Sequence, residues 1–399
     1  MEPGAPAGAS VRTFATGTSG VLYPPHLLDA LRELGTAFTA CAPMADDVWL
    51  HAVALRHGTG VRPVRDGRTA YRPIPRTLFR GLSTRNVLRG GNDMQIAADV
   101  PARAAGHSIV FDSPAELAAY TRHDRLSADG PLLLARRAGF HPDGPWPCSA
   151  LESAQNVLAT RARTMIEIEL RTTVDGRCVV LHEAVMGHGS TGAGPVSEQS
   201  ADYVLSQHLV DNYGEVTRFP IREAGEFLTW AVLAGAVLWL DVKNVTPEAV
   251  VELVRTHRAE GQVVVSVHGL TELAVYRRFA PDLVYFVPAH PDGLPTVDDV
   301  RREVPDLRRV IGFAGHYVPD MEESLRMRSW NVPMRLELHR YDENLSADAL
   351  DVHYYRRAVE AGFGILSTSH YREVADLLGL SAWAPKNASA RDDRGLTRH

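Results

Sequence analysis

The sequence predicts an α/β protein in which a (β/α)8 TIM barrel follows a smaller α/β segment. After Gly130, short apolar runs alternate with helical stretches over about 250 residues, which is the pattern of eight buried parallel strands. The chain has 399 residues, of which 45% are hydrophobic and 23% charged, as is typical of folded soluble proteins of this size. A doubly wound open sheet is the alternative, but no glycine-rich phosphate turn follows the first predicted strand.

Eight apolar runs supply the strands of the predicted barrel. They are residues 132–135, 165–170, 237–242, 262–267, 283–287, 310–314, 334–338 and 364–366. Helices are predicted at 27–34 and 46–57 within the smaller segment. We expect residues 1–10 and 383–399 to be a disordered N-terminus and a disordered tail. Between them we expect the smaller segment at 11–105, a linking strand and helix at 106–130 and the barrel at 131–382.

The charge and cysteine content exclude several classes of protein. The net charge is −6 and no block of like charge stands out, which argues against nucleic-acid partners and a polybasic membrane surface. The three cysteines are too scattered for a disulfide framework or a structural zinc site, and they fit a reducing compartment. The longest apolar run, 227–240, is shorter than the roughly 20 residues of a membrane span, and the N-terminus lacks the features of a secretory signal. We therefore expect a cytoplasmic protein without stable membrane insertion.

Acidic residues occur within two of the predicted strands. Glu167 and Glu169 are two residues apart and therefore face the same side of their strand, while apolar neighbours face the other. Asp241 and Lys243 have the same spacing in the next strand. Two unpaired carboxylates inside a barrel are unfavourable, and a divalent cation removes that penalty. The alternative is that the two glutamates alternate along a solvated edge strand.

A hairpin is predicted directly after the first acidic strand. The turn sequence T-V-D-G-R at 173–177 is followed by the run C-V-V-L-H-E, which returns His182 towards the carboxylates. Histidine is the side chain that most readily accepts and donates protons near neutral pH, so His182 is a candidate acid or base. A structural or surface role is the alternative for any single histidine. Five further histidines follow predicted strands: His268, His290, His316, His339 and His370.

These motifs resemble the signature of the glycerophosphodiester phosphodiesterase family. Residues 166–183 are similar to its I-E-x-D, T-x-D-G and V-V-x-H-D elements in order and spacing. Residues 189–197 are similar to its T-x-G-x-G-x-V-S loop, D-V-K at 241–243 falls where the family has E-x-K, and residues 362–368 resemble its final strand. The resemblance covers about 132–380 and implies a barrel that hydrolyses phosphodiesters, in lipid metabolism, with a divalent metal and two histidines.

The resemblance also implies roles for individual residues. Glu167, Glu169 and Asp241 match the family's metal ligands and are expected to bind Mg²⁺ or Ca²⁺. His182 matches one catalytic histidine, and Lys243 matches the lysine that contacts phosphate. Lys243 is the only lysine of the predicted barrel in a chain whose other basic residues, apart from one lysine in the tail, are all arginine. A compact ammonium group at this position is therefore expected to have a specific use.

The chain departs from the family at the first strand. The family's H-R-G is replaced by A-R-R-A-G, so that Arg136 stands in place of the first catalytic histidine. Gln155 and Asn156 occupy the family's E-N pair. Because an arginine stays protonated, Arg136 can neutralise phosphate charge beside Arg137 but cannot shuttle a proton. His316 is a further candidate for binding the substrate phosphate.

Three functions remain open at the level of sequence. The first is a metal-dependent hydrolase of a glycerophosphodiester or sugar-phosphodiester, weakened roughly 10²- to 10⁴-fold unless another group replaces the missing histidine. The second is a non-catalytic phosphate- or glycan-binding scaffold that partners a glycosyltransferase. The third is a lyase-like phosphodiesterase in which a neighbouring substrate hydroxyl attacks the phosphorus.

The smaller N-terminal segment resembles the acceptor half of GT-A-type bacterial glycosyltransferases. The residues that carry the resemblance are G-T-S-G-V-L-Y-P-P at 17–25, A-D-D-V-W-L at 45–50 and N-D-M-Q at 92–95. The resemblance implies that Asp46 and Asp47 lie at an acceptor site for a glycan. The alternative is that they cap the helix beginning at Val48. The nucleotide-sugar half is missing, so the segment alone is not expected to transfer sugar.

Overall fold

The computed structural model describes residues 21–34, 46–56, 111, 113–142, 144, 146–158, 163–288, 295–304, 306–316 and 321–380. The chain divides into two compact units, Met1–Ala104 and Ala105–His399. The first unit contains helices α1 (Pro25–Leu34) and α3 (Asp46–Arg56), which confirm the two helices predicted there. The expected disordered ends, 1–10 and 383–399, lie outside the described residues.

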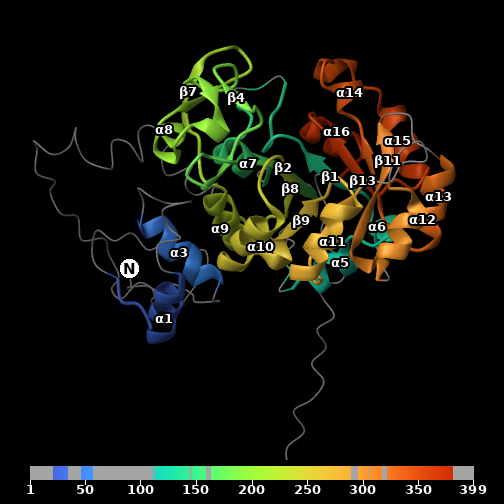
Figure 1. Ribbon diagram of the computed structural model, residues 1–399, viewed down its shortest axis with the longest axis horizontal. Helices are drawn as coiled ribbons and strands as arrows, with labels where there is room; N and C mark the ends of the chain where they lie inside the picture. The colour runs from blue at the N-terminus through green and yellow to red at the C-terminus, as the bar shows by residue number, and fades with distance from the viewer. Residues whose placement is uncertain are drawn as a thin grey trace, which may run out of the picture. The chain divides into compact units, whose positions relative to one another are not determined.

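The second unit is a closed barrel of eight parallel strands (Figure 1). The strand order is β1, β2, β8, β9, β10, β11, β12 and β13, and pairing of β13 with β1 closes the ring. The bounds are β1 (Leu132–Ala135), β2 (Thr164–Thr172), β8 (Leu238–Val242), β9 (Val263–Ser266), β10 (Val284–Val287), β11 (Val310–His316), β12 (Met334–Glu337) and β13 (Ile365–Thr368). All eight predicted strands are confirmed, and the open-sheet alternative is wrong because the first and last strands pair.

Helices surround the barrel, so strands such as β1 and β9 are buried along their whole length. The helices are α7 (Leu151–Leu158), α9 (Ala224–Ala234), α10 (Pro247–Thr256), α11 (Leu270–Phe279), α12 (Val297–Glu303), α13 (Met321–Ser329), α15 (Val352–Glu360) and α16 (Tyr371–Leu377), with short 3-10 turns η5 (Glu260–Gln262), η6 (Leu307–Arg309) and η7 (Ala347–Ala349). Side-chain caps fix several helix starts, including a capping box between Thr296 and Asp299 at α12.

Two helices cover the amino-terminal ends of the strands. Residues 106–130 were expected to form a linking strand and helix, but the described part forms α5 (Pro114–Tyr120) and α6 (His123–Asp129), while 106–110 lie outside the described residues. Leu117 and Leu126 from these helices join the barrel core. Arg163, just before β2, donates from Nη1 to the carbonyls of Asp129 and Gly130 at 2.9 and 2.6 Å. This end of the barrel is thereby closed.

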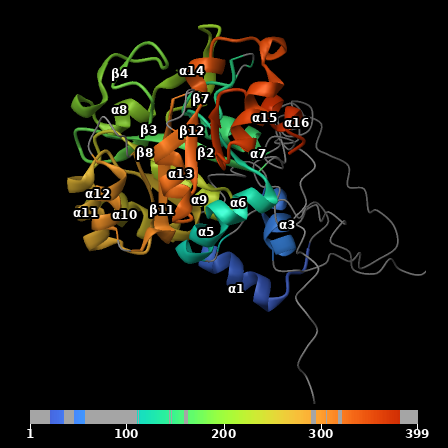
Figure 2. The same ribbon diagram turned by 90° about the vertical axis from the view of Figure 1, so that its right-hand side faces the viewer.

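An insertion between β2 and β8 extends the opposite end. It contains β3 (Cys178–Val180), β4 (Val185–Met186), β5 (Gly194–Pro195), η4 (Val196–Glu198), α8 (Ala201–Leu205), β6 (His208–Val210) and β7 (Val216–Pro220). It has a small apolar core of its own, which includes Leu181, Val204 and Leu209. In both ribbon views the insertion and α14 (His339–Asp342) lie at the end of the barrel away from α5 and α6 (Figures 1 and 2). The carboxyl ends of the strands, where barrel enzymes carry their active sites, therefore face the insertion.

Candidate active site

Strand β2 carries two buried carboxylates. Glu167 and Glu169 are 3% and 1% exposed, and the apolar side chains between them are also buried. β2 lies between β1 and β8 rather than at a free edge. The edge-strand alternative is therefore wrong for these residues, and both carboxylates belong to the packed interior.

Asp241 on β8 lies beside Glu169. The two residues are direct partners in the parallel register of β2 and β8. Burial, followed by the negative charges of Glu167 and Asp241, raises the pKa of Glu169 to about 8, and Arg136 and Lys243 offset this effect only in part. The Oε2 atom of Glu169 is buried and makes no hydrogen bond within the described part of the chain. Glu169 is thus a carboxyl group that the protein alone does not stabilise as an anion.

Two arginines neutralise two buried carboxylates of the barrel, Glu167 and Glu337. Arg136 follows β1, and its Nη1 lies 3.1 Å from Oε1 of Glu337 on β12, while its Nε lies 3.9 Å from Oε2 of Glu167. Arg335, also on β12, bridges Glu167 at 3.3 Å and makes a second ion pair with Glu337. Burial lowers the pKa of Arg136, but Glu167 and Glu337 outweigh this effect and raise it well above its ordinary value. Arg136 is a permanent cation within a buried network, so it carries no proton to or from a substrate.

Aromatic rings hold the second arginine in place. The guanidinium carbon of Arg335 lies 4.9 Å from the ring centre of Trp239 and 5.0 Å from that of Phe286. Its Nη2 also donates to Oγ of Ser367 at 3.3 Å. The network therefore contains two arginines and two glutamates, so its formal charges cancel. Glu169 remains without a cation within 4.0 Å among the described residues.

The predicted hairpin places His182 next to β2. β2 and β3 are antiparallel neighbours, and the amide of Leu181 donates to the carbonyl of Glu169 at 3.1 Å. Nδ1 of His182 lies 3.3 Å from Oε1 of Glu183, and the His182 amide donates to Oγ of Ser149 at 3.0 Å. A carboxylate at Nδ1 favours the tautomer that leaves Nε2 for proton exchange. Burial raises the pKa of Glu183, but its hydrogen bond with His182 and a backbone donor outweigh this and keep it ionised.

Two candidate phosphate ligands lie at the ends of β1 and β8. Nζ of Lys243 is 2.6 Å from Oδ2 of Asp241, and both side chains are partly exposed. Arg137 pairs with Glu343 through Nη1 and Oε1 at 3.2 Å. The loop that carries Arg137 is tightly folded: Gly139 has φ +87°, and a Cβ there would lie 2.8 Å from the carbonyl oxygen of Ser153. Each of these two cations is paired with a carboxylate near the carboxyl ends of the strands. An incoming phosphate can replace that carboxylate as the partner of the cation.

The remaining candidate histidines lie at different positions around the carboxyl ends of the barrel strands. Nε2 of His268 donates to the carbonyl of Val242 at 2.7 Å, which places it beside the end of β8. His316 is exposed at the end of β11, with its ring 5.2 Å from that of Phe313. His339 begins α14, but its side chain lies outside the described structure, as does all of His290. His370 is fully buried and belongs to a separate cluster with His141 and Glu373.

The ligand atoms of the three predicted metal-binding carboxylates are not tightly gathered. Among the described residues, the triad whose ligand atoms lie within 4.8 Å of one another is His141, His370 and Glu373. In the carboxylate group Glu167 and Asp241 are each drawn towards a cation. The donor set nevertheless suits a hard divalent ion, since it consists of oxygen ligands around one buried, unstabilised carboxylate.

In the N-terminal unit, Asp46 and Asp47 form the first turn of α3. Because α3 begins at Asp46, two residues before the expected start at Val48, the aspartates lie inside the helix rather than before it as caps; Oδ1 of Asp47 accepts from the amide of Val48 at 3.0 Å. Burial raises the pKa of Tyr23, and the charges of both aspartates add to this effect, which places Tyr23 near them. The glycosyltransferase-like residues at 17–20 and 92–95 lie outside the described residues.

Sequence reasoning missed Arg335 and Glu337. Both lie in the predicted strand 334–338, where M-R-L-E-L repeats the alternation of I-E-I-E-L in β2. The same period-two argument that selected Glu167 and Glu169 would have selected this pair. It also missed Glu183 as the partner that orients His182, although the two are neighbours in the sequence.

Comparisons with known proteins bear on the fold. No family model matches the chain. The uncharacterised protein YqiK of Bacillus subtilis is 26% identical over 127 residues, which are 30% of this chain and 51% of that protein. The chain thus spans about half the length of this curated relative.

Solved structures of phosphodiesterases share the barrel. A glycerophosphoryl diester phosphodiesterase from Parabacteroides distasonis superposes with a TM-score of 0.63 at 20% identity, covering 70% of this chain and 97% of that one. A proposed glycerophosphoryl diester phosphodiesterase from Silicibacter pomeroyi gives a TM-score of 0.52 at 16% identity, covering 65% and 97%. These similarities establish a common fold, on which function has to be argued from the site. Among the described helices, none combines the length and apolarity that crossing a bilayer requires.

Proposed function

We propose that the protein is a metal-dependent phosphodiester hydrolase that acts on a glycerophosphodiester or a sugar-phosphodiester. The observation that carries the proposal is the buried carboxylate of Glu169, flanked by Glu167 and Asp241 at the carboxyl ends of β2 and β8. The shared fold with glycerophosphodiester phosphodiesterases and the matching sequence motifs support it.

Glu167, Glu169 and Asp241 would hold the metal, with Mg²⁺ or Ca²⁺ as the expected ion. Such an ion supplies charge neutralisation at a phosphate oxygen. It also offsets the burial, and the repulsion by Glu167 and Asp241, that raise the pKa of Glu169. Asp241 now pairs with Lys243, so ligation by Asp241 would leave the ammonium of Lys243 able to bind the phosphate.

The protein's own groups divide the remaining work. Lys243 and Arg137 bind the non-bridging phosphate oxygens and orient the diester. His182, with its Nδ1 directed to Glu183, moves a proton at Nε2. His316 is exposed at the end of β11, where it can contact the alcohol or phosphate end of the substrate. Arg136 pairs with Glu337 and Glu167 inside the barrel and takes no part in proton transfer.

The replacement of the family's first catalytic histidine by Arg136 defines the weak point of the mechanism. A hydrolysis that activates water and protonates an alkoxide normally uses two proton carriers, and losing one lowers turnover roughly 10²- to 10⁴-fold. His268, beside the end of β8, and His316 and His339 on the far rim are the candidates to replace it. Each is tested by replacement with asparagine.

The decisive experiment is an assay of the full chain against a panel of phosphodiesters with Mg²⁺, Ca²⁺ and Mn²⁺. Product analysis separates the mechanisms, because hydrolysis gives a phosphomonoester whereas attack by a neighbouring hydroxyl gives a cyclic phosphate. Calorimetric titration should show one metal site that Glu167→Ala abolishes. A folded protein that binds metal but cleaves no member of the panel would contradict the hydrolase proposal.

The second candidate function is a phosphate- or glycan-binding scaffold that partners a glycosyltransferase. The burial of Arg136 in an ion-pair network favours it, because that network replaces an acid/base group by a fixed charge. On this proposal the diester binds without turnover, and Asp46 and Asp47 contact a glycan acceptor. Tight binding of a non-cleaved diester that weakens in Lys243→Met would support it.

A further inference from the structure

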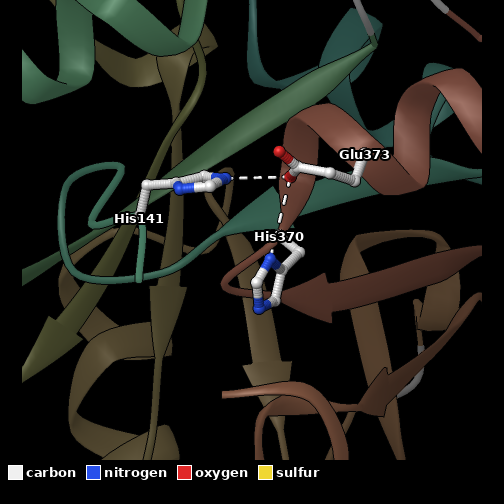
Figure 3. Close-up of side chains that lie close together, drawn as sticks. All are labelled: His141, His370 and Glu373. Atoms are coloured by element: carbon white, nitrogen blue, oxygen red, sulfur yellow. Dashed lines mark hydrogen bonds and ion pairs between the residues drawn. The ribbon is translucent and has the colours of Figure 1, made fainter. Parts of the chain in front are cut away.

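A second group of metal-ligating side chains lies where the barrel closes. His141 follows β1 in the chain, while His370 and Glu373 lie at the start of α16, directly after β13 (Figure 3). β1 and β13 pair in register from Leu132 with Ile365 to Ala135 with Thr368. The three side chains therefore join the segments that follow the first and the last strand of the barrel.

The three ligand atoms converge. Nε2 of His141 lies 2.8 Å from Oε2 of Glu373, and Nδ1 of His370 lies 3.8 Å from the same oxygen. All three lie within 4.8 Å of one another. In a tetrahedral zinc site with bonds of about 2.0–2.1 Å, ligand atoms lie roughly 3.3 Å apart. The observed separations fall on both sides of that value, so small side-chain rotations complete the geometry.

The surroundings hold the ligands in place. The amide of His370 donates to Oγ1 of Thr368 at 3.0 Å, and the side chain of Asn212 donates to the carbonyl of His141. The ring of Tyr371 packs edge-on against that of His141 at 5.8 Å. The hydroxyl of Thr368 also donates to Oδ2 of Asp342, a buried carboxyl group, at 2.5 Å, so Thr368 connects Asp342 to the backbone of His370.

Burial and charge are those of a metal site rather than a surface ion pair. His370 is 0% exposed and His141 is 5% exposed, whereas the side chain of Glu373 is 27% exposed. The partly exposed carboxylate of Glu373 gives a cation a route into the cluster and leaves a position for water.

We propose that His141, His370 and Glu373 bind a transition-metal ion, with Zn²⁺ the best match, and that this ion ties the loop after β1 to the start of α16. Two imidazoles and one carboxylate suit Zn²⁺ or Co²⁺, whereas Mg²⁺ and Ca²⁺ prefer oxygen ligands. The site is separate in residues and in metal preference from the carboxylates of β2 and β8. The ion would connect the chain segments that follow the first and last strands of the barrel.

The test uses the full-length protein, stripped of metal and held in millimolar Mg²⁺ so that the carboxylates of β2 and β8 are supplied with a hard cation. Titration with Zn²⁺ is followed by calorimetry and by melting temperature, and titration with Co²⁺ is followed by its visible absorption bands. We expect one Zn²⁺ per chain, tetrahedral-type Co²⁺ bands and a melting temperature about 5 °C higher at a free Zn²⁺ concentration 100 times Kd.

The variants are chosen to keep the fold. Glu373→Gln is nearly isosteric and removes the charged ligand, and His141→Gln removes one imidazole. His208→Gln, at an exposed histidine of the insertion, is the matched control. Circular dichroism verifies that each variant is folded. We expect Glu373→Gln and His141→Gln to weaken Zn²⁺ binding at least about 100-fold, since even removal of a residue behind the ligands costs 10- to 100-fold.

Two results would overturn the proposal. One is a folded parent protein that binds no Zn²⁺ in the presence of Mg²⁺. The other is Zn²⁺ binding of parental affinity in both Glu373→Gln and His141→Gln. Neither result depends on catalytic activity, so the outcome is independent of whether the protein hydrolyses phosphodiesters.

Discussion

Replacing Glu169 by glutamine should stabilise the metal-free protein at neutral pH. In the folded state the pKa of Glu169 is raised from 4.5 to about 8, chiefly by burial and then by Glu167 and Asp241. The folded protein therefore keeps a proton that the unfolded chain releases, so its stability falls as the pH rises between these two values. Integrating that difference gives an unfavourable contribution of about 3 kcal/mol at pH 7 and close to zero at pH 4.

Glu169→Gln removes this titration while keeping the shape of the side chain. We expect the variant to unfold at a higher denaturant concentration than the parent at pH 7 in EDTA, and at nearly the same concentration at pH 4. Glu215→Gln, an exposed carboxylate in the insertion, is the matched control and should change neither value. In Mg²⁺ or Ca²⁺ at 100 times the parent's Kd the difference should disappear, because the ion stabilises the parent by about 3 kcal/mol and the variant lacks a ligand. If Glu169→Gln is no more stable than the parent at pH 7 in EDTA, then burial and the charges of Glu167 and Asp241 do not oppose ionisation of Glu169, and the reasoning is refuted.

Three further predictions concern the cations and the histidine of the site. Lys243→Arg and Lys243→Met should both fold but should bind the diester more weakly than the parent in calorimetry. If Lys243→Arg binds the diester with parental affinity, Lys243 is only the counter-charge of Asp241. His182→Asn should lower turnover by about 10²- to 10⁴-fold with little change in KM, whereas Glu183→Gln, which alters the contact that orients His182, should lower kcat by a smaller factor. Arg136→His should destabilise the protein by about 3–5 kcal/mol in denaturant titrations, because it leaves buried carboxylates uncompensated, and an unchanged midpoint would contradict the ion-pair network.

The strands of the barrel were predictable because each is an apolar run with a polar or helical segment on either side. The same periodicity placed Glu167 and Glu169 on one face. The insertion was harder, since β4 and β5 are only two residues long and depend on each other for pairing. The helices α5 and α6 were missed as a pair because they are short and derive their stability from covering the barrel end rather than from their own sequence.

The ion-pair network and the histidine cluster could not be derived from the sequence for a different reason. Arg136 and Glu337 are about 200 residues apart, and only the closing of the barrel brings β1 next to β13 and within one strand of β12. Which acid neutralises which base depends on side-chain reach across the interior. The pattern identified charged residues correctly, but it could not show that, among the described residues, Glu169 has no cation within 4.0 Å.

The charge balance of the barrel bears directly on which phosphodiester reaction the site supports. A histidine at the end of β1 would exchange protons, whereas Arg136 holds a fixed charge that Glu337 and Glu167 offset. A fixed charge can contribute to electrostatic stabilisation of the transition state, but it does not activate water. If His182 is the sole proton carrier, attack by a substrate hydroxyl is favoured over attack by water, because an intramolecular nucleophile is already positioned and gains effective concentration. The reaction product therefore shows whether another residue replaces the missing histidine. A cyclic phosphate indicates that no second proton carrier is present. A phosphomonoester indicates that a histidine on the opposite side of the barrel end acts as the second proton carrier.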